Sequence, residues 1–177
     1  MSCVAIIPAR GGSKRIPRKN LKPFDGVPMI VRSIRTALES GLFESVVVST
    51  DDDEIADVAR AHGAEVPFMR PADLADDFTG TAAVIVHALQ QLPTFDYACC
   101  VYATAPLLQA RYLRQGLDLL KQHPRQGQAA GNVAAADGWR GVGADQHSHC
   151  SSPPALSAAY RYSARCQSSG VSMSWTK

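Results

Sequence analysis

The segment that most constrains this chain is its start, where a short apolar run gives way to a glycine-containing loop rich in cations. Residues 3–7 are continuously apolar, as in a strand that is buried on both faces of a parallel sheet. After Pro8, Gly11 and Gly12 permit positive φ angles, so backbone N–H groups can approach an anion closely. Five cations lie in the same loop: Arg10, Lys14, Arg15, Arg18 and Lys19. This arrangement predicts a polyphosphate site directly after the first strand.

Apolar strand-like runs alternate with helical periodicity up to about residue 122. We expect strands at 3–7, 46–48 and 97–102, a short edge strand at 66–68, and helices at 28–40, 52–62, 81–92 and 110–122. This alternation with short connections predicts an α/β sheet with helices on both faces. Functional groups of such sheets gather at the carboxyl ends of the strands, here the Arg10 loop, residues 49–51 and residues 102–106.

Composition excludes several classes of protein. A length of 177 residues suits one domain, and a net charge of +2 gives no field that demands a nucleic acid or a membrane. The basic loop lacks aromatic residues for stacking on bases, and no apolar stretch reaches the length of a membrane span. The first residues are typical of a strand and not of a leader sequence. The five cysteines fit neither a zinc site nor a disulfide framework, so we expect a cytoplasmic protein.

The loop also matches a specific pattern. Residues 7–20 read IPARGGSKRIPRKN, which resembles the IPARGGSKxIPxKN signature of the CMP-sugar synthetases, the acylneuraminate and pseudaminate cytidylyltransferases. No Walker loop is present. The resemblance implies a Rossmann-like nucleotide-diphospho-sugar transferase sheet, of which this chain holds an incomplete part.

By this resemblance, Arg10, Lys14 and Lys19 are the catalytic cations, which hold the triphosphate of CTP and the leaving pyrophosphate. Asn20 would contact the nucleotide. The full set that the resemblance assigns to nucleotide binding in this loop is Arg10, Gly11, Gly12, Ser13, Lys14, Lys19 and Asn20. Arg15 and Arg18 occupy variable positions of the pattern and are interpreted as surface charges.

Two later motifs extend the resemblance. Arg70-Pro71 with Leu74-Ala75-x-Asp77 resembles the family's RPxxLAxD motif, which implies nucleotide binding by Arg70 and by the hydroxyl of Thr81. Thr81 is alternatively the N-cap of the helix that follows it. Tyr102 begins a YATAP segment where sialate-activating members carry a glutamine-containing QPTSP type. The YATAP form resembles the pseudaminic acid branch, with Tyr102 either in the binding site or inside the strand.

Acidic residues are interpreted mainly as structural. Ser49-Thr50-Asp51 matches the family's STD segment, and residues 51–54 are predicted to be the acidic first turn of a helix and not a metal cage. Asp76 and Asp77 are interpreted as loop charges, and the histidines show no ligand spacing. The resemblance implies Mg²⁺ with CTP, but its main ligands are expected beyond residue 122, so the metal ligands stay unknown.

The character of the sequence changes after residue 122. From 123 to 177 the large aliphatic residues and methionines are only Val133, Val142, Leu156, Val171 and Met173, and no strand or helix period is visible. We therefore divide the chain into 1–122, the N-terminal part of a cytidylyltransferase domain, and 123–177, a tail without the family pattern. The tail is either disordered or, as we favour, translated from a shifted reading frame. Without the later strands, the last strand is expected to expose an unpaired edge.

The reaction implied is transfer of CMP from CTP to the anomeric hydroxyl of a nine-carbon sugar acid, with release of pyrophosphate. Pseudaminic acid is the favoured acceptor and N-acetylneuraminate the next. Two alternatives stay open: a degenerate fragment that binds nucleotide without catalysis, and an activator of another sugar acid such as ketodeoxyoctonate. The resemblance also implies a homodimer, although no dimer arm is recognisable, and we expect weak or absent turnover from this chain.

Overall fold

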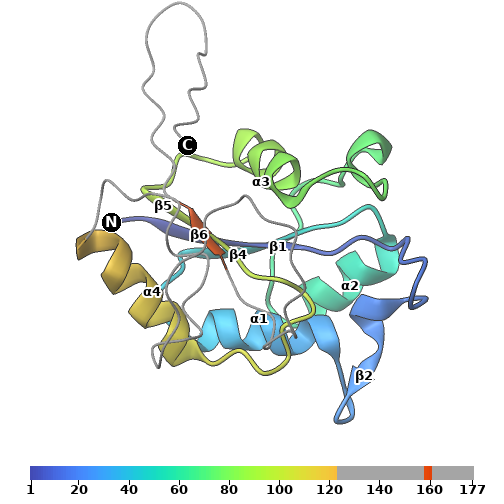
Figure 1. Ribbon diagram of the computed structural model, residues 1–177, viewed down its shortest axis with the longest axis horizontal. Coiled ribbons are helices and arrows are strands. Elements are labelled where there is room, and N and C mark those ends of the chain that lie inside the picture. Colours follow the sequence, from blue (N-terminus) through green and yellow to red (C-terminus); the bar gives the residue numbers. More distant parts are fainter. Residues whose placement is uncertain (123–157, 161–177) are drawn as a thin grey trace, which may run out of the picture.

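The computed structural model describes residues 1–122 and the backbone of residues 158–160. Its main sheet contains β1 (Cys3–Pro8), β4 (Ser45–Ser49), β5 (Tyr97–Cys100) and β6 (Ala158–Tyr160), in the order β4-β1-β5-β6 (Figure 1). β1 lies in the middle and pairs in parallel with both β4 and β5. The first strand of the sequence is therefore the centre of the sheet, which explains its uninterrupted apolar run.

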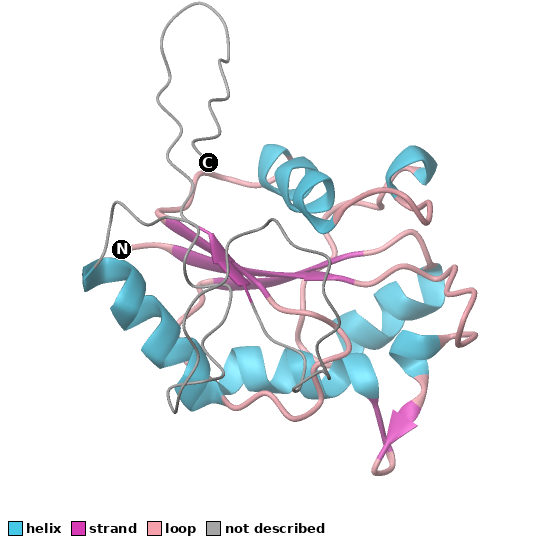
Figure 2. Ribbon diagram, in the orientation of Figure 1, coloured by secondary structure: helices cyan, strands magenta, loops and turns pink. Residues whose placement is uncertain are grey.

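Helices cover both faces of the sheet (Figure 2). Ala5 and Ile7 of β1 point to the face covered by α1 (Met29–Glu39), α2 (Asp53–Ala61) and α4 (Ala110–Gln122). Val4 and Ile6 point to the opposite face, where α3 (Thr81–Gln90) packs. Because side chains alternate along a strand, β1 contributes to both apolar cores at once. The predicted α/β sheet with helices on both faces is confirmed.

The predicted helices are all present, with ends that differ by at most two residues. An Asp-Gly pair is a turn signal in a sequence, and Asp25-Gly26 predicts a turn in this way. That turn is present between β2 (Pro23–Phe24) and β3 (Val27–Pro28), with φ angles of 50° and 75°. Two short 3₁₀ helices, η1 (Lys19–Leu21) and η2 (Ala72–Leu74), lie in loops that were not expected to contain helical turns.

Two strand predictions were wrong in detail. The edge strand expected at 66–68 is absent: the pairing is a single parallel bridge between Val47 and Glu65. Pro67 lacks an N–H group, so the segment cannot continue that pairing. The strand expected at 97–102 ends at Cys100, which places Tyr102 in the following loop.

The far edge of β5 is paired. The backbone of β6 runs antiparallel to it, with Ala98 opposite Tyr160 and Cys100 opposite Ala158. The prediction that the last strand exposes an unpaired edge is therefore wrong for residues 98–100 of β5. The expectation that no strand follows residue 122 is also wrong, because β6 lies at residues 158–160. The frame-shift and disorder hypotheses concern residues 123–177, nearly all of which lie outside the described residues.

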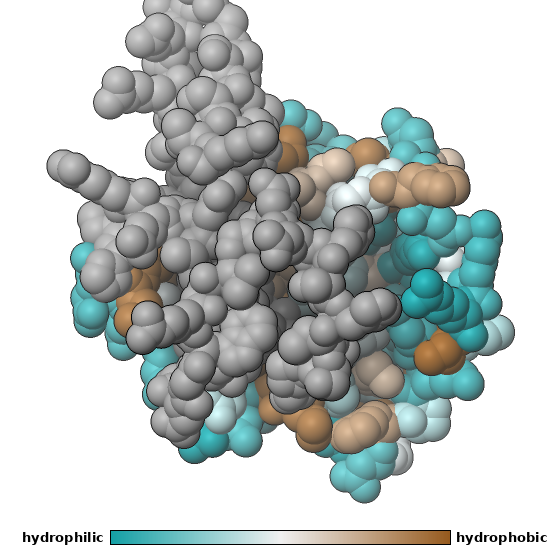
Figure 3. Space-filling model, in the orientation of Figure 1, coloured by the Kyte–Doolittle hydropathy of each residue, from teal (hydrophilic) through white to brown (hydrophobic). Residues whose placement is uncertain are grey.

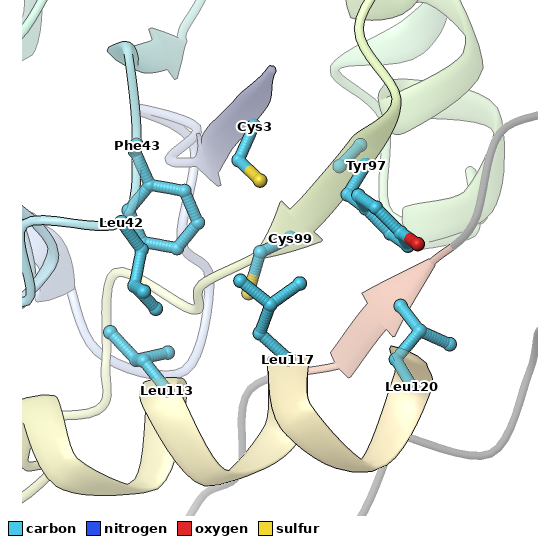
Figure 4. A pocket seen from close by; sticks show the side chains of 9 residues that line it. Cys3, Leu42, Phe43, Tyr97, Cys99, Leu113, Leu117 and Leu120 are labelled. Carbon is cyan, nitrogen blue, oxygen red and sulfur yellow. The ribbon is translucent and has the colours of Figure 1, made fainter. Parts of the chain in front are cut away.

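A small apolar cavity of about 20 Å³ lies between the sheet and α4 (Figure 4). Its lining comes from the start of β1, the start of β5, the 42–43 segment and α4: Cys3, Leu42, Phe43, Tyr97, Ala98, Cys99, Leu113, Leu117 and Leu120. The cavity lies at the amino ends of the parallel strands and has room for little more than one water molecule. The cavity is therefore a small gap in the apolar core and is not part of the predicted site at the carboxyl ends.

Three cysteines, Cys3, Cys99 and Cys100, are buried free thiols. Burial raises the pKa of Cys99 and Cys100 to about 12, so these thiols stay protonated and unreactive. Among the helices of the described residues, none is both long enough and apolar enough to cross a bilayer.

Candidate functional site

The site is built from the loops at the carboxyl ends of the three parallel strands. Hydrophilic side chains dominate this side of the molecule, at the right of Figure 3. Backbone and side-chain hydrogen bonds hold the loops together: the Ala9 N–H donates to the Ser49 carbonyl over 3.0 Å, and the Ser33 hydroxyl donates to the Tyr102 carbonyl over 2.9 Å. The position is the one at which open α/β sheets bind ligands.

The glycine loop is fixed by the acids that follow β4. The Gly11 N–H donates to Asp51 Oδ1 over 3.0 Å. A Cβ atom added at Gly11 would lie 2.8 Å from the Asp52 Cβ and still closer to its Oδ2, whereas one added at Gly12 would meet no atom within 4 Å. Neither glycine is among the described residues with positive φ, so the conformational reason predicted for this pair was wrong. Gly11 is needed because Asp52 approaches it closely.

Asp52 also joins the loop to α2. Its Oδ1 accepts a hydrogen bond from the Ile55 N–H over 3.0 Å, which makes Asp52 the N-cap of α2. Its Oδ2 lies 2.8 Å from Nη1 of Arg18, whose second nitrogen pairs with Glu54. Arg18 itself holds a left-handed backbone, with φ 54°. The acidic helix start is confirmed, and Arg18, interpreted as a surface charge, fastens the far end of the loop to that helix.

We expect Asp52→Ala to lower the free energy of unfolding by about 1–2 kcal/mol, because the variant loses both the N-cap and the Arg18 pair. Asp52→Asn keeps an oxygen that can cap α2 and loses only the charge, so it should cost less than about 0.5 kcal/mol. Urea denaturation followed by circular dichroism measures both. Equal losses for the two variants would contradict the capping role.

The two main cations of the loop share one carboxylate. Nη2 of Arg10 lies 2.7 Å from Asp77 Oδ1, and Nζ of Lys14 lies 2.5 Å from Asp77 Oδ2. Arg10 also donates to the Asp76 carbonyl. The structure thus brings Arg10 and Lys14 together, as the polyphosphate prediction requires. The interpretation of Asp77 as a plain loop charge missed this contact, although its place in the RPxxLAxD motif was a usable signal.

Asn20 and Lys19 lie in η1, beneath the start of the loop. Asn20 is only 6% exposed, and its Nδ2 donates to the Arg10 carbonyl over 2.9 Å. Lys19 is half-buried and makes no ion pair within residues 1–122. Ser13 is half-buried as well, and its N–H donates to the Gly11 carbonyl. Asn20 therefore supports the backbone that carries Arg10, a role in addition to the predicted nucleotide contact.

Arg70 is buried behind the loop. Its Nε donates to the Ser49 hydroxyl over 3.2 Å, its Nη2 donates to the Ser49 carbonyl, and its backbone N–H donates to Thr50. The pKa of Arg70 is lowered, because burial disfavours its charge more than the nearby charge of Asp51 favours it. The guanidinium thus ties the motif that contains it to the end of β4.

Thr81 and Tyr102 lie apart from this network. Thr81 is the first residue of α3, whose N-cap is Gly80, so the alternative prediction that Thr81 is the N-cap was wrong. Tyr102 is half-buried in the loop after β5, and its position inside a strand is also contradicted. In the described part of the chain, neither side chain bonds to Arg10, Lys14, Asn20 or Arg70.

No group of three or more acidic, histidine or cysteine side chains in the described residues is arranged to hold a metal ion. The carboxylates that do lie at the site are engaged otherwise: Asp51 with the Gly11 N–H, Asp52 with α2 and Arg18, and Asp77 with two cations. These residues do not form a cage for the expected Mg²⁺.

Comparisons with known proteins identify the family of the chain. The sequence model of the cytidylyltransferase family matches residues 4–152. The chain is 48% identical over 127 residues to a pseudaminic acid cytidylyltransferase of Campylobacter jejuni, covering 70% of this chain and 55% of that protein. It is 39% identical over 125 residues to a CMP-N,N'-diacetyllegionaminic acid synthase of Legionella pneumophila, covering 68% of this chain and 54% of that protein. The chain spans about half the length of these relatives.

A solved structure is similar as well. A CMP:2-keto-3-deoxy-manno-octonic acid synthetase complexed with CTP superposes with a TM-score of 0.62 at 26% sequence identity, over 70% of this chain and 49% of that one.

Proposed function

The chain belongs to the cytidylyltransferase family, and we propose that the protein transfers CMP from CTP to a nonulosonic acid, with release of pyrophosphate. The observation that carries the proposal is the loop after β1, in which Arg10 and Lys14 converge on one pair of anionic oxygens. A site that holds a carboxylate between two cations has the geometry and charge to hold phosphate oxygens. The names of the relatives indicate the nucleotide and the class of acceptor.

In this proposal the residues act by positioning and by neutralising charge. Arg10, Lys14 and Lys19 hold the phosphates, and the cations stabilise the charge that develops on the leaving pyrophosphate. Gly11, Gly12 and Ser13 offer close backbone approach, while Asn20, Arg70, Thr81 and Tyr102 contact the nucleotide or the sugar. The anomeric hydroxyl attacks the α-phosphorus from the side opposite the pyrophosphate, and no covalent enzyme intermediate is needed.

Pseudaminic acid is the acceptor that we favour. It is the substrate in the name of the Campylobacter relative, at 48% identity, and the YATAP segment agrees with that choice. N-acetylneuraminate comes next. Mg²⁺ would accompany the triphosphate, but the described residues provide no ligand set, so no step is assigned to it. We also propose a cytoplasmic location, where the buried thiols stay reduced. A homodimer is proposed from the family resemblance, although no dimer arm is recognisable in the sequence.

Titration calorimetry of the chain with CTP and Mg²⁺ tests the proposal. We expect Arg10→Ala to weaken CTP binding by about tenfold or more, since one charge-assisted hydrogen bond to phosphate contributes about 1.5–3 kcal/mol. Arg15→Ala is the matched control, because Arg15 is exposed and makes no ion pair or side-chain hydrogen bond within residues 1–122. Its affinity should change less than about twofold.

Folded protein that does not bind CTP, or equal affinities for the two variants, would contradict the nucleotide site. If CTP binds, a pyrophosphate-release assay with pseudaminic acid, N-acetylneuraminate and ketodeoxyoctonate identifies the acceptor. Release with none of them would favour the alternative of a nucleotide-binding fragment without catalysis.

A further inference from the structure

Asp77 occupies the cations that the proposed function assigns to phosphate. Its two carboxylate oxygens are divided between them, with Oδ1 2.7 Å from Arg10 Nη2 and Oδ2 2.5 Å from Lys14 Nζ. The Asp77 side chain is 26% exposed, whereas that of Lys14 is 83% exposed. Hydrogen bonds from Lys14 and Arg10 lower the pKa of Asp77, so this carboxylate is ionised wherever nucleotides carry their full charge.

The turn around Asp77 is built to present it. Oδ1 of Asp76 accepts hydrogen bonds from the N–H groups of Phe78 and Thr79, at 3.0 and 2.6 Å. The Thr79 hydroxyl donates to the Asp73 carbonyl over 3.3 Å, and Arg10 donates to the Asp76 carbonyl. These bonds close residues 73–79 into a compact turn that leans on Arg10, so Asp77 does not reach the cations by chance contact of a free side chain.

We propose that Asp77 determines specificity at the phosphate site, as a tethered carboxylate that competes with incoming anions for Arg10 and Lys14. This inference rests on the proposed function. An N–H group that bonds Asp77 is not free for a ligand oxygen, and the carboxylate offsets charge on both cations, so an anion gains the full attraction of Arg10 and Lys14 only when it displaces Asp77. A triphosphate offers several oxygens and multiple charges to the two cations, whereas a carboxylate ligand offers only what Asp77 already supplies.

The competition has a use in the proposed reaction. Both substrates are anions: CTP carries a triphosphate, and the acceptor is a sugar acid that carries a carboxylate. Without a resident carboxylate, the acid group of the acceptor could occupy Arg10 and Lys14 and block CTP. Asp77 prevents this, because replacing its carboxylate by that of the acceptor yields no additional attraction to Arg10 and Lys14. Replacing it by a polyphosphate brings more negative charge to the two cations and is therefore favourable.

The test compares Asp77→Asn with Asp73→Asn by calorimetry at fixed ionic strength. Asp73 is an exposed acid of the same turn, and its carboxylate makes no ion pair in the described residues. The probes are CTP with Mg²⁺, inorganic tripolyphosphate, cytidine and citrate. We expect Asp77→Asn to tighten binding of CTP and tripolyphosphate by about three- to thirtyfold, from the loss of two partly exposed ion pairs. Cytidine affinity should not change, and citrate should compete with CTP only in this variant.

Several results would overturn the inference. Weaker CTP binding by Asp77→Asn would mean that Asp77 positions the cations and does not compete with ligands. An equal gain from Asp73→Asn would reduce the effect to net charge. The proposed function can fail separately. Folded protein that binds tripolyphosphate but not CTP would contradict the CTP site and would leave the competition by Asp77 supported. If the protein is folded, as shown by circular dichroism, but binds neither CTP nor tripolyphosphate, both the CTP site and the competition by Asp77 are contradicted.

Discussion

Replacement of Gly11 by alanine is expected to weaken CTP binding about hundredfold and to lower the free energy of unfolding by about 1–3 kcal/mol. The new Cβ would lie 2.8 Å from the Asp52 Cβ and 3.0 Å from its Cγ, closer than side-chain atoms can pack. The loop must therefore move away from α2, and Gly11 loses its 3.0 Å hydrogen bond to Asp51. Arg10, the neighbour of Gly11, moves with it. Calorimetry and urea denaturation measure the two effects.

Gly12→Ala is the matched control, because a Cβ at that position meets no atom within 4 Å. Its stability should stay the same or rise by about 0.4–1 kcal/mol, since alanine restricts the unfolded chain. If Gly12→Ala weakens CTP binding without loss of stability, the backbone of Gly12 approaches the ligand itself. Equal destabilisation by the two variants would contradict the packing argument for Gly11.

A rescue experiment separates crowding from other causes. All three atoms nearest to the added Cβ belong to the Asp52 side chain, so Asp52→Gly removes them together. Glycine is tolerated at an N-cap at a cost of a few tenths of a kcal/mol. In the Asp52→Gly background, Gly11→Ala should therefore cost less than about 0.5 kcal/mol, and a cost unchanged from the wild-type background would exclude a clash with Asp52.

The sequence was sufficient where a local pattern and its physical cause lie in the same segment. The apolar run of β1 predicted a strand that is buried on both faces, because only such a strand can be apolar at every position. The acids after β4 predicted a helix start because they complement its dipole, and Asp52 is the N-cap. The Asp25-Gly26 pair predicted a turn because few other pairs hold positive φ at both positions.

The sequence was insufficient where the cause is a contact between distant segments. Gly11 looked like a residue chosen for positive φ, but the constraint comes from Asp52, some 40 positions later. The partner of Arg10 and Lys14 lies more than 60 positions away in the chain, at Asp77. Pairing at Glu65 depends on the hydrogen bonds that Val46 and Val48 offer, which no periodicity within residues 66–68 reveals.

Arg70→Ala is expected to lower the free energy of unfolding by about 2–4 kcal/mol and to weaken CTP binding about hundredfold. Arg70 is 6% exposed, and its guanidinium donates to both the carbonyl and the hydroxyl of Ser49. The same Ser49 carbonyl accepts the Ala9 N–H, one residue before Arg10. Loss of Arg70 therefore loosens the end of β4, the start of the phosphate loop and the turn that carries Asp77.

Arg70→Lys and Arg60→Ala complete the experiment. Lysine keeps the charge but cannot donate from two fixed nitrogens to Ser49, so it should recover less than half of the lost stability. Arg60 is an exposed arginine paired with Asp57 on α2, and its removal should cost less than about 0.5 kcal/mol. Arg70→Ala that is as stable as Arg60→Ala would contradict the structural role. If Arg70→Ala is that stable and still loses CTP binding, the role of Arg70 is contact with the nucleotide, because the loop would then keep its geometry without the Arg70 side chain.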